Sequence, residues 1–387
     1  MPKPKHIVII AGEESGDYHA SVFVRELLSK DSNLIVTGIG GQHMQSAGVH
    51  LISDLARFGV TGFSEVLRHF GVIRRAFKDI QTHLSTVNPD LLVLVDYPGF
   101  NLRLAQFAKQ KLGLRILYYI SPQIWAWKAG RINIIRHCVD KMAVILPFEK
   151  KIYEQAGVPV AFVGHPLLHQ TKQTLSMADS REKLGLPKSK RVIALLPGSR
   201  RHEIERHMPI MLKSAEILCQ EFDDLHFVIP VANTINPQLI NAYFKNANIT
   251  YTLTESQAVP AAASSDCVVV ASGTASLECA LLEKPMCIIY KASLISFITI
   301  SRFIKIKYVG LCNILQNQMI VPELLQYDCN PVELTRAIKD LLTDQEVITR
   351  MQTRLKTLKS SLSSHHADTS ICTLIENELR IGSEKPS

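Results

Sequence analysis

Short apolar segments rich in β-branched residues alternate with helical stretches along this chain, and the alternation starts twice. The first series predicts strands at 6–10, 34–37, 91–96, 116–120 and 141–146. After a polar stretch at 170–190, a second series predicts strands at 191–196, 226–230, 266–271 and 286–290. Apolar strands separated by helical segments are typical of βαβ units on a parallel sheet.

Because the series of strands and helices begins a second time, we predict an α/β chain with two Rossmann-like, doubly wound parallel-sheet domains that face a cleft. We place the domains at 1–168 and 169–330, and C-terminal helices that pack across them at 331–387. At about 100–200 residues per domain, this division suits the chain length. Ligands of such sheets bind beyond the carboxyl ends of the strands, so the loops after the predicted strands hold the candidate site residues.

Positive charge is concentrated in the first half of the chain. Residues 1–168 carry 19 Lys and Arg against 13 Asp and Glu, in a chain of formal net charge +8. A basic surplus indicates an anionic partner, such as an anionic bilayer or a phosphorylated substrate. We expect no nucleic-acid partner, because the sequence has no dense basic run and no nucleic-acid-binding motif.

The segment 63–77 resembles a helix that lies in a membrane surface. Its apolar positions fall at helical spacing and cations lie beside them: Phe63, Val66, Leu67, Phe70, Ile73 and Phe77, with Arg68, Arg74, Arg75 and Lys78. An aromatic stripe bordered by cations is typical of interfacial helices. The alternative is a core helix with a solvated basic face. A second basic and aromatic stretch, at 297–308, favours the membrane.

Other features predict a cytoplasmic protein that is peripheral to the membrane. No apolar run reaches the roughly 18 residues of a spanning helix. The first residues lack the apolar region and the cleavage site of a signal peptide. The eight cysteines are scattered without CxxC pairs or metal-ligand spacing, so we expect reduced thiols.

Two loops of the first half carry acidic residues after predicted strands. One contains Glu14, Ser15, Gly16 and Asp17, whose acidity suits sugar hydroxyls better than a pyrophosphate. The other begins with Asp96, where partial burial would raise the carboxyl pKa toward that of a general base. The alternatives are a glycine turn capped by Asp17 and a helix-capping Asp96.

Both tryptophans of the chain, Trp125 and Trp127, lie in one loop after the predicted strand 116–120. Paired aromatic side chains suit acyl chains or sugar faces. The alternative is that they attach the loop to the core.

Two turns of the second half suit a diphosphate. Ser199 and Arg200 precede a predicted helix and offer a hydroxyl and a guanidinium at its N-terminus. Ser272, Gly273 and Thr274 open another predicted helix. Glu278 lies one turn into that helix, where a carboxylate can accept hydrogen bonds from ribose hydroxyls.

Seven strings between residues 11 and 326 resemble, in order, the motifs of the lipid-A-disaccharide synthase family. They are AGEESGDYHA, DYPGFNLRLA, YYISPQIWAWKAGR, LPFEKKIYEQAGVPVAFVGHPL, LLPGSRRHEI, ASGTASLECALLEKP and VPELLQ. The resemblance implies a GT-B fold and an inverting transfer of 2,3-diacylglucosamine from its UDP derivative to 2,3-diacylglucosamine 1-phosphate, known as lipid X. The products would be a β(1→6) disaccharide and UDP, formed at the cytoplasmic face of a Gram-negative inner membrane.

The resemblance also implies roles for single residues. Asp96 would be the base on the acceptor 6-hydroxyl, Arg200 with Ser199 would hold the diphosphate, Glu278 the ribose, and Asn313 a further donor contact. Acceptor-side residues would be Glu14, Ser15, Gly16, Asp17 and His19. One departure from the family pattern is Asn317 and Gln318, where relatives carry a Gly-Arg pair.

The sequence contains no DxD-type motif, so we expect no metal and no cofactor. Helix dipoles and basic side chains would meet the charge of the leaving UDP. A homodimer is compatible with the sequence. Two alternatives remain: another UDP-sugar enzyme of this architecture, such as a glycolipid N-acetylglucosaminyltransferase or a UDP-sugar 2-epimerase, and a non-enzymatic nucleotide-binding or scaffold protein.

Overall fold

The computed structural model describes residues 4–55, 70–125, 130–172, 174–232, 235–255, 257–292, 307–363 and 367–383. Contacts divide the chain into two compact units. Unit 1 comprises Met1–Pro166 and Leu362–Ser387, and unit 2 comprises Leu167–Ser361. The predicted cleft, and the predicted packing of C-terminal helices across the domains, stay predictions.

Unit 1 is built on a seven-stranded sheet of order β3-β2-β1-β4-β5-β6-β7. Its strands are β1 (His6–Ala11), β2 (Ile35–Gly40), β3 (His50–Asp54), β4 (Leu91–Val95), β5 (Ile116–Tyr119), β6 (Lys141–Val144) and β7 (Val160–Phe162). Every strand pair is parallel. The chain winds outward from β1 in both directions, which is the doubly wound arrangement that the sequence predicted.

Helices cover both faces of this sheet. Side chains alternate along its strands, so apolar residues point to both faces and each face needs a cover. Ile7 and Ile9 of β1 belong to one apolar cluster, with α1 (Glu14–Lys30) and α18 (Ile371–Ser383). Val8 and Ile10 belong to the other, with α4 (Phe70–Val87), α5 (Pro98–Leu112) and α6 (Arg131–Cys138). The described residues of unit 1 also form α2 (Gln42–Ser46) and α7 (Pro147–Gln155).

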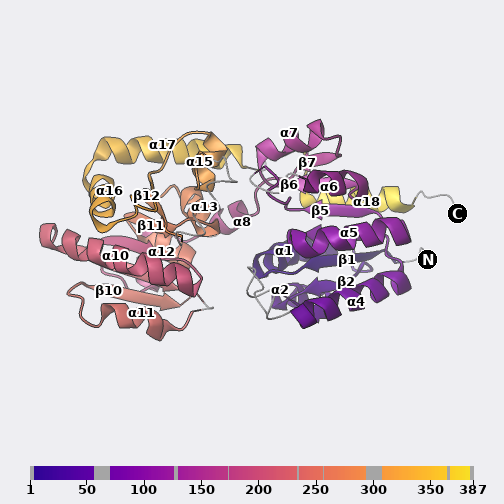
Figure 1. Ribbon diagram of the computed structural model, residues 1–387, viewed down its shortest axis with the longest axis horizontal. Coiled ribbons are helices and arrows are strands. Elements are labelled where there is room, and N and C mark those ends of the chain that lie inside the picture. The colour runs from indigo at the N-terminus through magenta and orange to yellow at the C-terminus, as the bar shows by residue number, and fades with distance from the viewer. Residues whose placement is uncertain are drawn as a thin grey trace. The chain divides into compact units, whose positions relative to one another are not determined.

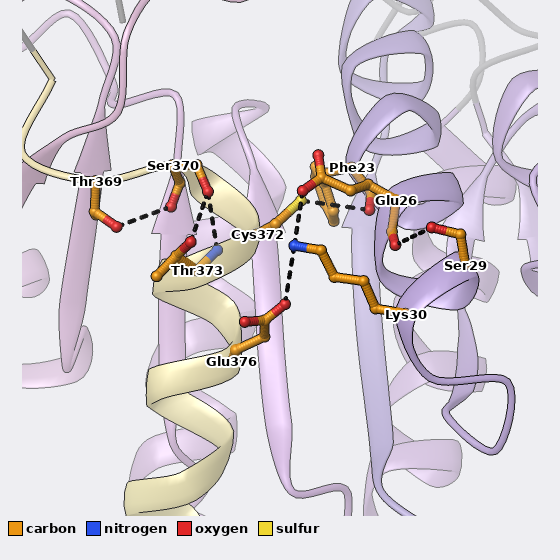
Figure 2. A network of polar contacts seen from close by, with 9 residues as sticks. All are labelled: Phe23, Glu26, Ser29, Lys30, Thr369, Ser370, Cys372, Thr373 and Glu376. Carbon is orange, nitrogen blue, oxygen red and sulfur yellow. Dashed lines mark hydrogen bonds and ion pairs between the residues drawn. The ribbon is translucent and has the colours of Figure 1, made fainter. Parts of the chain in front are cut away.

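The last helix, α18, lies among the elements of unit 1 although it ends the chain (Figure 1). Figure 2 shows it beside α1, where Lys30 Nζ contacts Glu26 Oε1 at 2.9 Å and Glu376 Oε1 at 3.3 Å. The Cys372 thiol donates to the Phe23 carbonyl at 3.7 Å. These contacts flank the buried apolar face of α18, so the helix is part of the core of unit 1.

Unit 2 is built on a six-stranded parallel sheet of order β10-β9-β8-β11-β12-β13. Its strands are β8 (Arg191–Leu196), β9 (Leu225–Val231), β10 (Tyr251–Glu255), β11 (Cys267–Ala271), β12 (Met286–Tyr290) and β13 (Glu323–Leu325). All four strands of the predicted second series are confirmed.

The helices of unit 2 include the two that carry its glycine turns, α10 (Arg201–Glu221) and α13 (Thr274–Leu281). The others are α8 (Leu167–Lys172), α9 (Met177–Lys183), α11 (Pro237–Phe244), α12 (Ala258–Ser264), α15 (Leu311–Gln316), α16 (Pro331–Thr343) and α17 (Gln345–Ser361). Of all the helices in the described ranges, none combines the length and apolar character needed to span a bilayer.

Candidate active site

Asp96 follows β4 directly and occupies a strained turn. Asp96 and Tyr97 both have φ of +45°, a left-handed conformation that is unfavourable for side chains with a Cβ. Hydrogen bonds hold this turn. The Asp96 amide donates to the Tyr119 carbonyl at 2.9 Å, and the Asp96 carbonyl accepts from Tyr118 Oη at 2.6 Å and Asn101 Nδ2 at 2.7 Å. Such strain persists only where the surroundings enforce it, and it is concentrated at functional sites.

The pKa of the Asp96 carboxyl lies above its ordinary value. Burial raises its pKa to about 6, although the Tyr97 amide and the charge of Arg131 oppose the rise. The N-cap of α5 is Tyr97, which makes no side-chain capping bond. Asn101 instead donates to the carbonyls of Val95 and Asp96. A carboxylate with a pKa near the working pH transfers protons efficiently.

The loop after β1 packs against the Asp96 turn. Val95 pairs with Ala11, so both loops begin at the same edge of the sheet. A Cβ on Gly12 would lie 2.3 Å from the Tyr97 ring, so only glycine fits there. Glu14 and Ser15, in the first turn of α1, are exposed.

Gly16 and Asp17 of this loop are buried. A Cβ on Gly16 would lie 3.6 Å from Val95 Cγ1, which places the start of α1 on β4. The Asp17 carboxylate accepts from the amides of Gly41 (2.7 Å), His43 (2.9 Å) and Met44 (3.1 Å). Asp17 therefore fixes the loop between β2 and α2, and its predicted contact with the acceptor stays a prediction.

His19 and His165, both in unit 1, have lowered pKa values. Burial lowers the pKa of His19 to about 4. Burial and the charge of His19 lower the pKa of His165 to about 3. Both imidazoles are therefore uncharged near neutral pH, and His19 would meet an acceptor through hydrogen bonds and not as a cation.

The loop after β5 is attached to a carboxyl group that the sequence analysis did not select. Glu149 Oε1 accepts from Ser121 Oγ at 2.6 Å and from Trp125 Nε1 at 3.1 Å. Trp125 also packs edge-on against Phe148, with ring centroids 5.1 Å apart. The attachment alternative is thus confirmed for Trp125, and Trp127 lies outside the described residues. The available signal was that Glu149 follows a predicted strand of the same sheet, as Asp96 does.

The first glycine turn of unit 2 is organised by an internal acid. Gly198 has φ of +120°, and a Cβ there would lie 2.4 Å from Glu203 Oε2. This oxygen accepts from the amides of Ser199 at 3.0 Å and Arg200 at 3.2 Å. The Arg200 guanidinium, half exposed, lies 3.5 Å from Glu203 Oε1. The amides are thus already bonded within the turn, and a diphosphate would be met mainly by the guanidinium.

His207, which the sequence analysis missed, links this turn to the end of β12. Its Nδ1 lies 2.7 Å from the Pro197 carbonyl, and its Nε2 lies 3.1 Å from the Lys291 amide. Those partners require a proton on Nδ1 and a neutral ring. Burial lowers the pKa of His207, in agreement with that form.

The second glycine turn lies between β11 and α13. Gly273 and Thr274 are exposed at the start of the helix, and the Ser272 hydroxyl lies 3.4 Å from the Val309 carbonyl. Glu278 is half-buried, and burial raises its carboxyl pKa. The N-terminus of an eight-residue helix favours an anion at this point.

Asn313 is fully buried and uses both ends of its amide inside unit 2. Its Oδ1 accepts from the amides of Ile320 (2.7 Å) and Val321 (3.0 Å), and its Nδ2 donates to Glu323 Oε1 (2.7 Å) and the Val321 carbonyl (2.8 Å). Glu323 also accepts from the amide of Gly310. Asn313 therefore orders the loop before β13, and its direct contact with a donor stays a prediction.

Comparison with known proteins gives matches along nearly the whole chain. A sequence profile of the family described as lipid-A-disaccharide synthetase matches residues 7–374. Lipid-A-disaccharide synthase 1 of Legionella pneumophila (strain Lens) is 55% identical over 98% of this chain and 99% of the relative. The lipid-A-disaccharide synthase of Trichlorobacter lovleyi is 41% identical over 96% of this chain and 97% of the relative.

Solved structures match the fold. UDP-GlcNAc 2-epimerase from Neisseria meningitidis, bound to UDP-GlcNAc, aligns with a TM-score of 0.65 at 13% identity over 97% of this chain and 100% of that one. At that identity the likeness concerns the fold alone. It confirms the predicted GT-B class and gives no reason to prefer an epimerase.

Proposed function

This chain belongs to the lipid-A-disaccharide synthase family, and from this membership we propose that it joins two acylated glucosamine units. It transfers 2,3-diacylglucosamine from UDP-2,3-diacylglucosamine to 2,3-diacylglucosamine 1-phosphate and releases UDP. The structural observation that carries the chemistry is the half-buried Asp96 carboxyl, held in a strained turn at the end of β4 with a pKa of about 6.

In the proposed reaction Asp96 accepts the proton of the acceptor 6-hydroxyl while that oxygen attacks the anomeric carbon of the donor. The bond from this carbon to the diphosphate breaks, and UDP leaves with the electron pair. Attack on the face opposite UDP inverts the configuration. Arg200 supplies positive charge to the diphosphate, Ser199 a hydroxyl, and the N-terminus of α13 its dipole. Glu278 accepts from the ribose hydroxyls.

The reaction is tested by incubating the protein with UDP-2,3-diacylglucosamine and 2,3-diacylglucosamine 1-phosphate and following the products by mass spectrometry. A disaccharide 1-phosphate and an equal amount of UDP support the proposal. Turnover of UDP-GlcNAc to its 2-epimer, with no disaccharide, would identify an epimerase. Binding of UDP without any turnover would identify a nucleotide-binding protein.

We expect the transfer to proceed in EDTA at an undiminished rate, because basic side chains and helix dipoles supply the countercharge. The described residues bring together no group of three potential metal ligands among His, Cys, Asp and Glu. The measurement is the initial rate in EDTA and in added Mg²⁺. A rate that EDTA abolishes and Mg²⁺ restores would contradict this mechanism.

Because both substrates carry acyl chains, we propose that the enzyme works on the cytoplasmic face of the inner membrane. Helix α4 offers a surface for this: Phe70 is 57% exposed, and Arg74, Arg75 and Lys78 are exposed beside it. Each basic residue near an anionic surface would contribute about 1 kcal/mol. The other predicted membrane residues at 63–69 and 297–306 lie outside the described residues.

The opposite face of α4 belongs to the core, which confirms the core alternative for Ile73 and Phe77. The Phe77 ring packs edge-on against Phe100, with centroids 5.1 Å apart. We therefore expect Phe70→Ser to weaken binding to anionic vesicles and to leave the melting temperature unchanged. Phe77→Ser should instead lower the free energy of unfolding by about 3 kcal/mol. Vesicle sedimentation and thermal melts measure the two effects, and a Phe70→Ser protein that binds vesicles normally would rule out this surface.

A further inference from the structure

Three neighbouring strands of unit 1 end beside one another, and each is followed by a polar side chain. Val95 of β4 pairs with Tyr119 of β5, and Tyr119 pairs with Ala143 of β6. Asp96 follows β4, Ser121 follows β5, and Glu149 opens α7 after β6. The carboxyl ends of parallel strands share one edge of the sheet, so these residues gather around the proposed base.

Glu149 is an unusual attachment point for a loop. Its side chain is almost completely buried, with 2% exposure. Oε1 receives both side-chain hydrogen bonds, from Ser121 and Trp125. Oε2 is buried and has no hydrogen-bond partner in the part of the chain that the structure describes. Burying a carboxyl group with one oxygen unsatisfied is unfavourable, and a backbone carbonyl could accept the same two bonds at less cost.

We propose that Glu149 is a positioning residue for the transfer reaction, which holds residues 121–125 next to Asp96. This inference rests on the proposed role of Asp96. The hydrogen bond from Trp125 fixes the indole, and the hydrogen bond from Ser121 fixes the start of the same loop. A loop fixed at both points keeps its place beside the base while the acceptor binds.

The charge of Asp96 affects the pKa of Glu149. Burial raises the pKa of Glu149 to about 7, hydrogen bonds from Ser121, Trp125 and the Leu146 backbone oppose the rise, and the charge of Asp96 adds to it. Two carboxyl groups that interact electrostatically do not ionise independently of each other.

Within the described ranges, three other ionisable groups act on the two carboxyls or are acted on by them. Tyr118 and Tyr153 are buried phenols whose pKa values are raised by burial, so they stay neutral at working pH. Arg131 acts on Asp96 as a cation. Of these groups, we therefore expect Asp96 and Glu149 to change charge between pH 5 and 8.

Tryptophan fluorescence can follow this ionisation without substrate. The chain has two tryptophans, so Trp127→Phe leaves Trp125 as the sole emitter in the full-length protein. We expect its emission to change with a midpoint near pH 7, where Glu149 ionises. Glu149→Gln should abolish the transition. Asp96→Asn should move the midpoint to lower pH, because the charge that raises the Glu149 pKa is gone.

Activity tests the positioning role. Glu149→Gln keeps an acceptor oxygen and should retain kcat within about threefold, whereas Glu149→Leu should lower kcat about 10- to 100-fold. The KM for the donor should change little, because the donor residues are in unit 2. Glu154→Leu, exposed on the same helix, is the matched control. If Glu149→Leu does not fold, Ser121→Ala and Trp125→Phe remove the two donors singly, and each should lower kcat.

Either of two kinetic results would overturn the inference: a folded Glu149→Leu protein with normal kcat, or single-donor variants with normal kcat. A fluorescence midpoint that Asp96→Asn leaves in place would also overturn it. The fluorescence measurement distinguishes a failure of this inference from a failure of the proposed function. If Asp96→Asn shifts the fluorescence midpoint but the parent protein makes no disaccharide, the proposed function is refuted. The electrostatic interaction between the two carboxyls is then still supported.

Discussion

Replacing Asp96 by asparagine should lower kcat for disaccharide formation about 10²- to 10⁴-fold, the usual effect of removing a general base. The fold should survive, because the backbone amide and carbonyl of residue 96 make hydrogen bonds that hold the turn and that the substitution leaves in place. Initial rates at saturating substrates measure the loss. Asp79→Asn, on the exposed face of α4, is the matched control and should match the parent protein.

The pH profile gives this prediction a second measurement. A base must be unprotonated, and burial raises the pKa of Asp96 to about 6, so activity should fall as the pH falls through about 6. Asp96→Asn should remove that acid limb. A variant that stays within about threefold of the parent rate would show that another group accepts the proton, with Glu14 or His19 as the next candidates.

The same pKa predicts a cost in stability. A carboxyl whose folded-state pKa lies above its unfolded value favours the folded state below the unfolded pKa, and this advantage is lost as the pH rises through the folded pKa. For Asp96 that window runs from 3.8 to about 6. At pH 8, therefore, Asp96→Asn should melt at a higher temperature than the parent protein.

Arg200→Ala should weaken UDP binding about 10- to 150-fold, corresponding to a charge-assisted contact of about 1.5–3 kcal/mol. The turn itself should persist, since Glu203 binds the amides of residues 199 and 200 whatever side chain follows. Calorimetric titration with UDP measures the affinity. The control is Arg201→Ala, because Arg201 is exposed and pairs with Glu205 at 2.7 Å.

Equal UDP affinity in both arginine variants and the parent would mean that the turn before α10 has a structural role only. Weaker binding in both variants to the same degree would indicate a diffuse effect of positive charge. Only the selective loss in Arg200→Ala supports a diphosphate at this position.

The predicted strands were those with continuous apolar runs, because a buried parallel strand needs apolar side chains on both faces. The structure confirms all nine of them. It adds β3, β7, β10 and β13. These strands are short or half-buried, so their sequences show little of the apolar pattern used to predict strands. β13, for example, has three residues, all of them partly exposed.

The turns that hold the candidate site residues could be predicted as loops that follow strands, but the hydrogen-bond partners of those residues could not. Glycines at 198 and 273 marked real turns with positive φ. The acid that occupies the first turn, Glu203, and the histidine that supports it, His207, gave no local signal. Glu149 is 28 residues from Ser121 and 24 from Trp125, so only the folded sheet brings them together.

The placement of α18 has a consequence for synthesis on the ribosome. Unit 2 is encoded as one uninterrupted stretch, whereas unit 1 needs residues that emerge after unit 2 is complete. Domains usually fold as they emerge, the N-terminal one first. Here unit 1 cannot complete its core until α18 has emerged, because Ile7, Ile9 and Phe23 lack one of their partner helices before then. A chain that stops shortly before residue 371 would retain every residue of unit 2 and lose part of the core of unit 1.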